Sequence, residues 1–269
     1  MQFYCTSPIK RKHEVLGGYY YVRCGQCARC VVRRKAIWTG RALCEWNSNG
    51  PDGAFCTLTY DDDHVDAASY EDVKLFLKLI RLVYPLRFLA VPDTGDQFGR
   101  FHWHLLLFGP QVTPILQDFV QEKWRCGLTD TRPINYERIG YTCGYVTKKI
   151  AGETVGRLRS SQFFGRDQLL AICAEYAATF GPITDYPTVL KLGKKRFPIG
   201  PTQRKYIADA FGLQPNSRPT WDYSVEGHVQ NYRTLSLHGA IREEKQLLSK
   251  RGTTIGSTSR TEIRMKELP

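Results

Sequence analysis

Two histidines separated by one residue are the first candidates for chemistry in this 269-residue sequence. His102 and His104 lie in the stretch 100–109, where aromatic and branched residues run up to Gly109-Pro110, and this pattern predicts a β-strand. Side chains two apart in a strand point to the same face, so the two imidazoles project together. Such a pair supplies half of a metal site, although half-exposed or hydrogen-bonded histidines would show the same spacing.

Asp93 is the candidate third ligand of this site. A second strand is predicted over 87–91, and residues 92–99 have the composition of a turn or hairpin tip. If the two strands pair, Asp93 can reach the ion held by the histidines. Two imidazoles and one carboxylate leave coordination positions open, and an open divalent site can polarise a phosphoryl oxygen.

Two tyrosines could act as nucleophiles beside such an ion. Tyr141 and Tyr145 are four residues apart, so on a helix they face the same way. A phenol with a pKa near ~10 is a poor nucleophile unless a metal and a cation assist it. Lys148 follows Tyr145 by one helical turn and is the candidate cation. The chain has 15 tyrosines, so packing is the alternative explanation for this pair.

A second metal site is indicated by cysteines near the N-terminus. Cys24, Cys27 and Cys30 fall within seven residues, and Cys5 adds a fourth thiol. Four thiolates satisfy tetrahedral Zn²⁺, an iron–sulfur cluster is the second interpretation, and buried cysteines without a metal are the third. The chain has an odd number of cysteines, 9, and no apolar leader segment, which favours reduced thiols over disulfides.

Positive charge is concentrated at the N-terminus. The formal net charge is +12, and residues 1–41 hold nine Lys or Arg against one acid, Glu14. A surface that meets nucleic-acid phosphates has this character, whereas a merely solvated surface is the alternative. The candidate DNA-binding residues are Arg29, Arg33, Arg34, Lys35, Arg41, Lys149, Lys194, Lys195 and Arg196.

Hydrophobic periodicity predicts the elements that position these residues. Strands are expected at 19–22, 55–60, 87–91, 100–109 and 133–139, a strand ribbon at 189–197, and helices at 29–46, 70–84, 114–124, 141–150, 167–179, 202–211 and 241–250. From residue 55 to 150 the order is strand, helix, strand, strand, helix, strand, helix. This order predicts an α+β fold in which a ferredoxin-like or RRM-like split βαβ core forms an antiparallel sheet with helices on one face.

The predicted organisation has three parts. Residues 1–50 form a cysteine-rich basic segment with a helix, residues 51–155 form the sheet core, and residues 156–269 form a helical, basic extension. Within the last part, residues 251–262 are rich in Gly, Ser and Thr and are expected to be mobile. No apolar run approaches the ~18 residues that a membrane span needs, so no membrane partner is expected.

Three separated motifs resemble those of HUH endonucleases. They are residues 55–64 (FCTLTYDDDH), the His102-Trp103-His104 strand and residues 145–149 (YVTKK), in that order. Within this class the chain is most similar to the replication initiators of microviruses, especially the gokushovirus type, and residues 24–30 (CGQCARC) are similar to their cysteine cluster. The sequence departs from relatives at Asp93, where Glu is common, at Phe101, where Pro is common, and at Gly144, where two-tyrosine relatives carry Lys.

The resemblance implies rolling-circle initiation on an origin in single-stranded DNA. Mn²⁺ or Mg²⁺ at the histidine pair would activate the scissile phosphate, and Tyr145 would attack it, leaving a 5′-phosphotyrosine and a free 3′-OH. Tyr141 is a candidate second nucleophile. The resemblance also implies a host helicase and polymerase as partners, and the cytoplasm of a bacterial host as the location. Two alternatives remain open: a non-catalytic, zinc-containing nucleic-acid-binding protein, and a metal-dependent hydrolase that uses water.

Overall fold

The computed structural model describes residues 5–12, 18–95, 99–146, 157–183 and 187–213, and the backbone of residues 234–235. By its internal contacts the chain divides into two units, which we call the central unit (Arg41–Asp167) and the terminal unit (Met1–Gly40 with Gln168–Pro269). The division falls inside helix α1 (Ala28–Ser48). The three-part division expected from the sequence stays a prediction.

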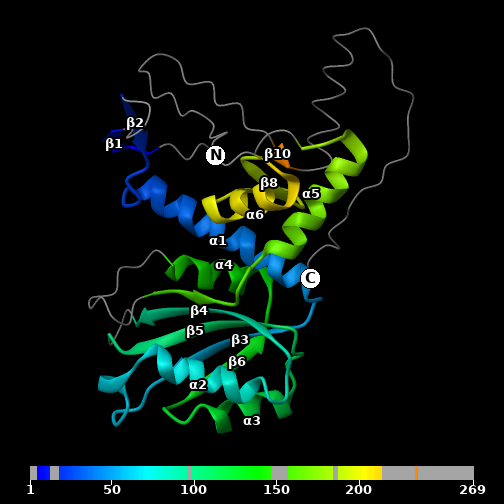
Figure 1. Ribbon diagram of the computed structural model, residues 1–269. Coiled ribbons are helices and arrows are strands. Elements are labelled where there is room, and N and C mark those ends of the chain that lie inside the picture. Colours follow the sequence, from blue (N-terminus) through cyan, green and yellow to red (C-terminus); the bar gives the residue numbers. More distant parts are fainter. Residues whose placement is uncertain are drawn as a thin grey trace. The chain divides into compact units, whose positions relative to one another are not determined.

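The central unit is built on a five-stranded sheet of antiparallel neighbours in the order β6-β3-β5-β4-β7 (Figure 1). Its elements, in chain order, are β3 (Gly53–Thr59), the short 3₁₀ helix η1 (Val65–Ala67), α2 (Tyr70–Ile80), β4 (Arg87–Thr94), β5 (Phe101–Phe108), α3 (Pro114–Lys123), β6 (Thr129–Pro133), α4 (Tyr136–Tyr145) and β7 (Arg159–Ser160). The α+β class, the antiparallel sheet and the order of elements are therefore confirmed. That the sheet is of the HUH type stays a prediction.

The two faces of this sheet are covered by different helices. Trp103, Leu105 and Leu107 of β5 are fully buried against α2 and α3. The alternate residues of β5, including His104, point to the opposite face, where α4 lies (Figure 1). The prediction that helices cover one face only is therefore wrong, because α4 packs on the histidine side.

The segment between β6 and α4 also corrects a prediction. A strand was expected over 133–139, but β6 ends at Pro133 and a helix begins at Tyr136. The carboxamide of Asn135 accepts a hydrogen bond from the Arg138 amide at 2.8 Å, which caps the helix N-terminus and starts it earlier than its apolar pattern suggests. The residues of the expected helix 141–150 that follow Val146 lie outside the described part of the chain.

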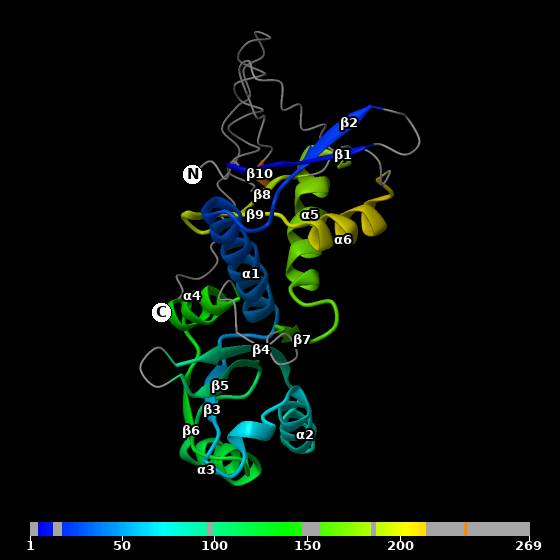
Figure 2. The same ribbon diagram turned by 90° about the vertical axis from the view of Figure 1, so that its left-hand side faces the viewer.

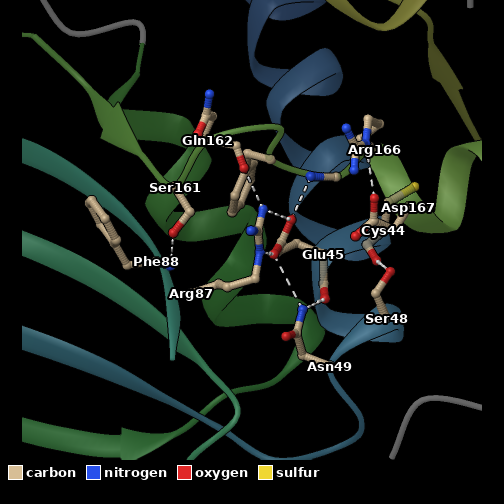
Figure 3. A network of polar contacts seen from close by, with 12 residues as sticks. Cys44, Glu45, Ser48, Asn49, Arg87, Phe88, Ser161, Gln162, Arg166 and Asp167 are labelled. Atoms are coloured by element: carbon tan, nitrogen blue, oxygen red, sulfur yellow. Dashed lines mark hydrogen bonds and ion pairs between the residues drawn. The ribbon is translucent and has the colours of Figure 1, made fainter. Parts of the chain in front are cut away.

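A buried carboxylate fastens the second half of α1 to β4. Glu45 is 3% exposed and accepts hydrogen bonds from the Arg87 guanidinium and, at 2.5 Å, from the Gly165 amide (Figure 3). Arg87 also donates to the Gln162 carbonyl at 2.7 Å. Gly165 has φ 71°, and a Cβ there would stand 2.5 Å from the Arg41 carbonyl oxygen, so only glycine fits this close approach.

The terminal unit contains the first half of α1 and several short elements. They are β1 (Ile9–Lys12), β2 (Tyr19–Val22), α5 (Arg166–Phe180, whose first residues belong to the central unit), β8 (Val189–Leu192), β9 (Lys195–Pro198), α6 (Pro201–Phe211) and β10 (Thr234–Leu235). The expected ribbon near 189–197 and the helix that Gly212 ends, with φ 66°, are confirmed. Strand β1 was not predicted. The helix expected over 241–250 and the segment 251–262 lie outside the described residues.

Candidate functional site

The strand register places the predicted metal ligands on one face of the sheet. Asp93 of β4 lies directly opposite His102 of β5, and Thr57 of β3 lies opposite His104. The hairpin between β4 and β5 therefore does what the sequence predicted: it brings a carboxylate from one strand beside two imidazoles from the next. Because the side-chain period is two, a register slip of one residue would have sent the histidines to the other face.

The three side chains converge through specific atoms. The Nε2 atoms of His102 and His104 lie 3.1 Å apart, and the Asp93 Oδ2 atom lies 3.4 Å from the first and 3.9 Å from the second. Asp93 is 2% exposed and His104 4% exposed, so the carboxylate and one imidazole are nearly removed from water. A cation among these donors would offset the cost of burying the carboxylate, which makes the cluster a candidate metal site.

Neighbouring groups orient the two imidazoles. The Nδ1 atom of His102 lies 3.1 Å from the Arg100 carbonyl oxygen, which can only accept, so this nitrogen carries the proton. The Nε2 atom of His102 is thereby left as the ligand. The Nδ1 atom of His104 lies 3.2 Å from the Thr57 hydroxyl, and the Phe55 ring stacks on the His104 imidazole at 5.5 Å. Neither Thr57 nor Phe55 was singled out for this site from the sequence; only their alternation on the strand preceding the acidic turn could have suggested them.

We expect Thr57→Val to weaken binding of Mn²⁺ by about 10- to 100-fold, because the hydroxyl that orients His104 is lost while the β-branched shape is kept. Titration of the metal, followed by calorimetry or by the spin signal of free Mn²⁺, would measure this. Thr59→Val is the matched control, since the Thr59 hydroxyl donates to the Leu128 carbonyl and not to an imidazole. Equal affinities for parent and Thr57→Val would contradict the orienting role.

Helix α4 brings both candidate tyrosines to the histidines. The Tyr145 ring lies 4.7 Å from the His104 ring, and the Tyr141 ring lies 5.4 Å from it. The Tyr145 hydroxyl donates a short hydrogen bond to the Tyr141 hydroxyl. Ile139 and Cys143 are fully buried, while Tyr141 is 51% exposed. The spacing of four therefore places the phenols together, as predicted, and the packing of α4 on the sheet adds their contact with His104.

The predicted DNA-binding residues have different surroundings. Arg29, Lys35, Lys194, Lys195 and Arg196 are exposed on the terminal unit.

Three other members of this set are less available for phosphates or were not placed. Arg34 is exposed but donates to the Gly25 carbonyl at 2.9 Å, and Arg33 donates to the Ile199 carbonyl at 3.3 Å. Lys149 and the predicted catalytic Lys148 lie outside the described residues.

Arg41 does not fit the role expected for it. Its side chain is 8% exposed, and its guanidinium donates two hydrogen bonds to the Phe164 carbonyl, at 3.2 and 3.1 Å. A buried guanidinium held in this way cannot reach a phosphate, so assigning Arg41 to DNA binding was wrong. Helical periodicity could not show this, because the covering residue is 123 positions away.

The acidic turn after β3 has a structural explanation. The Asp61 carboxylate accepts a hydrogen bond from the His64 amide at 3.1 Å and pairs with the His64 ring, which raises the pKa of His64 and lowers that of Asp61. Asp62 pairs with Arg100 at 2.5 Å. These groups are exposed, so the solvated turn is the better interpretation of this stretch.

The four N-terminal cysteines form a second cluster, in the terminal unit. The Sγ atoms of Cys5, Cys24, Cys27 and Cys30 all lie within 4.8 Å of one another. The Sγ atom of Cys5 is 3.5 Å from that of Cys24 and 3.9 Å from that of Cys27. Four thiols at these distances can hold one metal ion, although the cluster does not identify the metal.

Local hydrogen bonds favour the thiolate form of two of these cysteines. The amides of Cys27 and Gln26 donate to Cys24 and lower its pKa. Contacts from Thr6, together with the Cys30 amide, lower the pKa of Cys27 to about 5. Burial instead raises the pKa of the Cys30 thiol to about 12, so its thiolate would need a neighbouring cation.

Among the described residues, none of the helices combines the length and the apolar composition of a transmembrane span.

A protein-family model for the replication-associated protein ORF2 matches residues 53–150, which begin at β3 and include the histidines and both tyrosines. Among the curated proteins, replication-associated protein ORF4 of Chlamydia phage 1 is 27% identical over 174 residues, covering 55% of this chain and 43% of the phage protein. Replication-associated protein VP4 of Bdellovibrio phage phiMH2K is 26% identical over 191 residues, covering 55% and 59% of the two chains.

A third relative, replication-associated protein ORF2 of Spiroplasma virus 4, is 25% identical over 155 residues and covers 48% of each chain. The chain spans about half the length of the curated relatives it matches. No solved structure gives a significant match. These matches confirm the predicted resemblance to the replication initiators of microviruses.

Proposed function

We propose that this chain, like the microvirus replication-associated proteins it resembles, initiates replication, and that it does so by cutting one DNA strand through its own tyrosine. One observation carries the proposal. The Tyr145 ring lies 4.7 Å from the ring of His104, whose Nε2 atom converges with His102 and Asp93. A nucleophile and a metal-binding cluster thus occupy the same face of the sheet.

The reaction is a phosphoryl transfer to the protein. The Tyr145 oxygen attacks the scissile phosphorus, the bond from phosphorus to the 3′ oxygen breaks, and the phenolic proton ends on the released 3′-OH. The DNA then carries a 5′-phosphotyrosine on Tyr145, and the phosphodiester energy is kept in that link. Attack by a 3′-OH on the link reverses the exchange and rejoins the strand without ATP.

His102, His104 and Asp93 are proposed to hold a divalent ion, Mn²⁺ or Mg²⁺. Such an ion, when bound, would withdraw charge from the phosphoryl oxygen and fix its position. Mixed nitrogen and oxygen ligands suit Mn²⁺. The carbonyl of Arg100 and the hydroxyl of Thr57 would keep both Nε2 atoms turned toward that ion.

The cysteine cluster is proposed to hold Zn²⁺. With Zn–S bonds of about 2.3 Å, a tetrahedral site places neighbouring sulfurs about 3.8 Å apart. The separations of 3.5 Å and 3.9 Å from Cys5 to Cys24 and Cys27 support this geometry. A four-iron cluster fits less well, because each thiolate then binds a different iron and the sulfurs stand farther apart.

The proposed partners follow from the chemistry. The substrate is single-stranded DNA that contains the origin. The released 3′-OH needs a polymerase to extend it, and displacement of the old strand needs a helicase, both supplied by the bacterial host.

The test is incubation of the protein with single-stranded origin DNA and Mn²⁺, followed by denaturing electrophoresis. A protein–DNA adduct that survives denaturation supports the proposal. Cleavage without an adduct would favour a hydrolase that uses water, and binding without cleavage would favour a non-catalytic nucleic-acid-binding protein.

We expect His102→Ala combined with His104→Ala to remove detectable nicking and to weaken Mn²⁺ binding by on the order of 100-fold or more, because two of three ligands are lost. Affinity for the same DNA without metal should stay near the parental value, as measured by fluorescence anisotropy. His64→Ala is the matched control, since that exposed imidazole pairs with Asp61 of the nearby acidic turn. Nicking by the double variant would refute the metal role.

A further inference from the structure

The β-ribbon formed by β1 (Ile9–Lys12) and β2 (Tyr19–Val22) presents tyrosines to solvent (Figure 2). Tyr19 is 65% exposed, Tyr20 37% and Tyr21 38%. Every side chain of β1 is exposed as well. Three consecutive large aromatic residues in a two-stranded ribbon add little to a core, and such ribbons are only marginally stable, so their presence on the surface is typical of a binding face.

The register sorts these side chains into two faces. Lys10 pairs with Tyr21, and Lys12 pairs with Tyr19. Since these pairs are two residues apart, their side chains share one face. The Lys10 ammonium lies 4.1 Å from the centre of the Tyr19 ring, which agrees with this sorting. We call the set Lys10, Lys12, Tyr19 and Tyr21 the aromatic-basic face of the ribbon.

The chemistry of this face points to an anionic ligand with flat, unpaired rings. Neither strand contains an acidic residue, whereas β1 carries three consecutive cations, from Lys10 to Lys12. The Cβ atoms of Tyr19 and Tyr21 are separated by two strand residues, about 6.8 Å along the strand. This spacing lets two phenol rings each take one base of an extended strand while the lysines meet its phosphates. Bases in a duplex are already stacked and cannot do this.

We propose that the aromatic-basic face binds single-stranded DNA by stacking two bases on Tyr19 and Tyr21, with Lys10 and Lys12 on the phosphates. The choice of DNA over RNA rests on the proposed replication function. The surface itself lies in the terminal unit and uses none of the residues proposed for strand cutting.

The test measures anisotropy of a labelled, single-stranded oligodeoxynucleotide that lacks the origin. We expect Tyr19→Leu with Tyr21→Leu to weaken binding about 10-fold or more, because stacking is lost while apolar strand residues remain. Tyr19→Phe with Tyr21→Phe should bind like the parent, because a phenyl ring still stacks. Circular dichroism and limited proteolysis of the leucine variant check that the ribbon is intact.

The lysines have a separate readout. Lys10→Gln with Lys12→Gln should lower the slope of log affinity against log salt by about 1.4, at about 0.7 for each phosphate contact on single strands. Lys74→Gln with Lys78→Gln removes the same charge from exposed positions of α2 and should leave that slope unchanged.

Two results would overturn the proposal. The first is an intact leucine variant with parental affinity, and the second is tyrosine-dependent binding that prefers RNA of the same sequence or duplex DNA. With saturating origin DNA, the leucine variant should still form the covalent adduct at the parental level. Absence of an adduct in the parent would instead count against strand cutting and leave the stacking result standing.

Discussion

Tyr145→Phe is expected to abolish the covalent adduct with single-stranded origin DNA while leaving binding of that DNA intact. Phenylalanine keeps the ring that packs 4.7 Å from His104 but has no oxygen to attack phosphorus. Loss of a nucleophile typically lowers the rate by on the order of 10⁴-fold or more, so no adduct should appear in the time the parent needs for completion. Denaturing electrophoresis of labelled DNA measures the adduct, and anisotropy measures binding.

Tyr141→Phe is the matched comparison, because it removes the same atom from a ring 5.4 Å from the same imidazole. The hydroxyl of Tyr141 accepts the hydrogen bond of Tyr145, so this variant should still form the adduct, at a changed rate. If Tyr145→Phe forms the adduct and Tyr141→Phe does not, the nucleophile has been assigned to the wrong phenol. If both single variants form it and the double variant does not, both phenols are competent.

The part of the site that local patterns could predict is the part that strands specify. Alternation along 101–108 puts Trp103 in the core and the histidines on the other face, because a shift of one residue would bury imidazoles and expose the indole. The hairpin to β4 then brings Asp93 opposite His102. Each of these steps needs information from fewer than 20 residues of sequence, which is why all of them were predictable.

What sequence reasoning missed depends on packing between distant segments. Spacing predicted that Tyr141 and Tyr145 share a helix face, but not that α4 covers the histidine side of the sheet. Arg41 looked like a solvent-facing cation until the Phe164 carbonyl closed over it. The start of α4 was missed for a local reason: one capping side chain, Asn135, outweighed residues that read equally well as a strand.

The cysteine cluster gives the prediction with the largest expected effect on folding. Cys24→Ser with Cys27→Ser should reduce bound zinc from about one ion per chain to almost none, because two of four thiolate ligands are removed. Structural zinc contributes about 10–16 kcal/mol of apparent binding free energy, as much as the whole stability of a typical domain. The segment from Cys5 to Cys30 should therefore lose its structure in this variant, and treatment of the parent with a chelator should do the same.

Elemental analysis and amide hydrogen exchange check both parts of this prediction. Residues 18–30 should exchange rapidly in the double variant, whereas strand β5, whose core side chains are fully buried, should stay protected, since the two belong to different units. Cys126→Ser is the matched control, because it removes a half-buried thiol outside the cluster and should keep the zinc. A parent protein without zinc would remove the claim. A double variant that keeps the ion would show that these two sulfurs do not hold it, despite backbone amides that stabilise Cys24 as a thiolate.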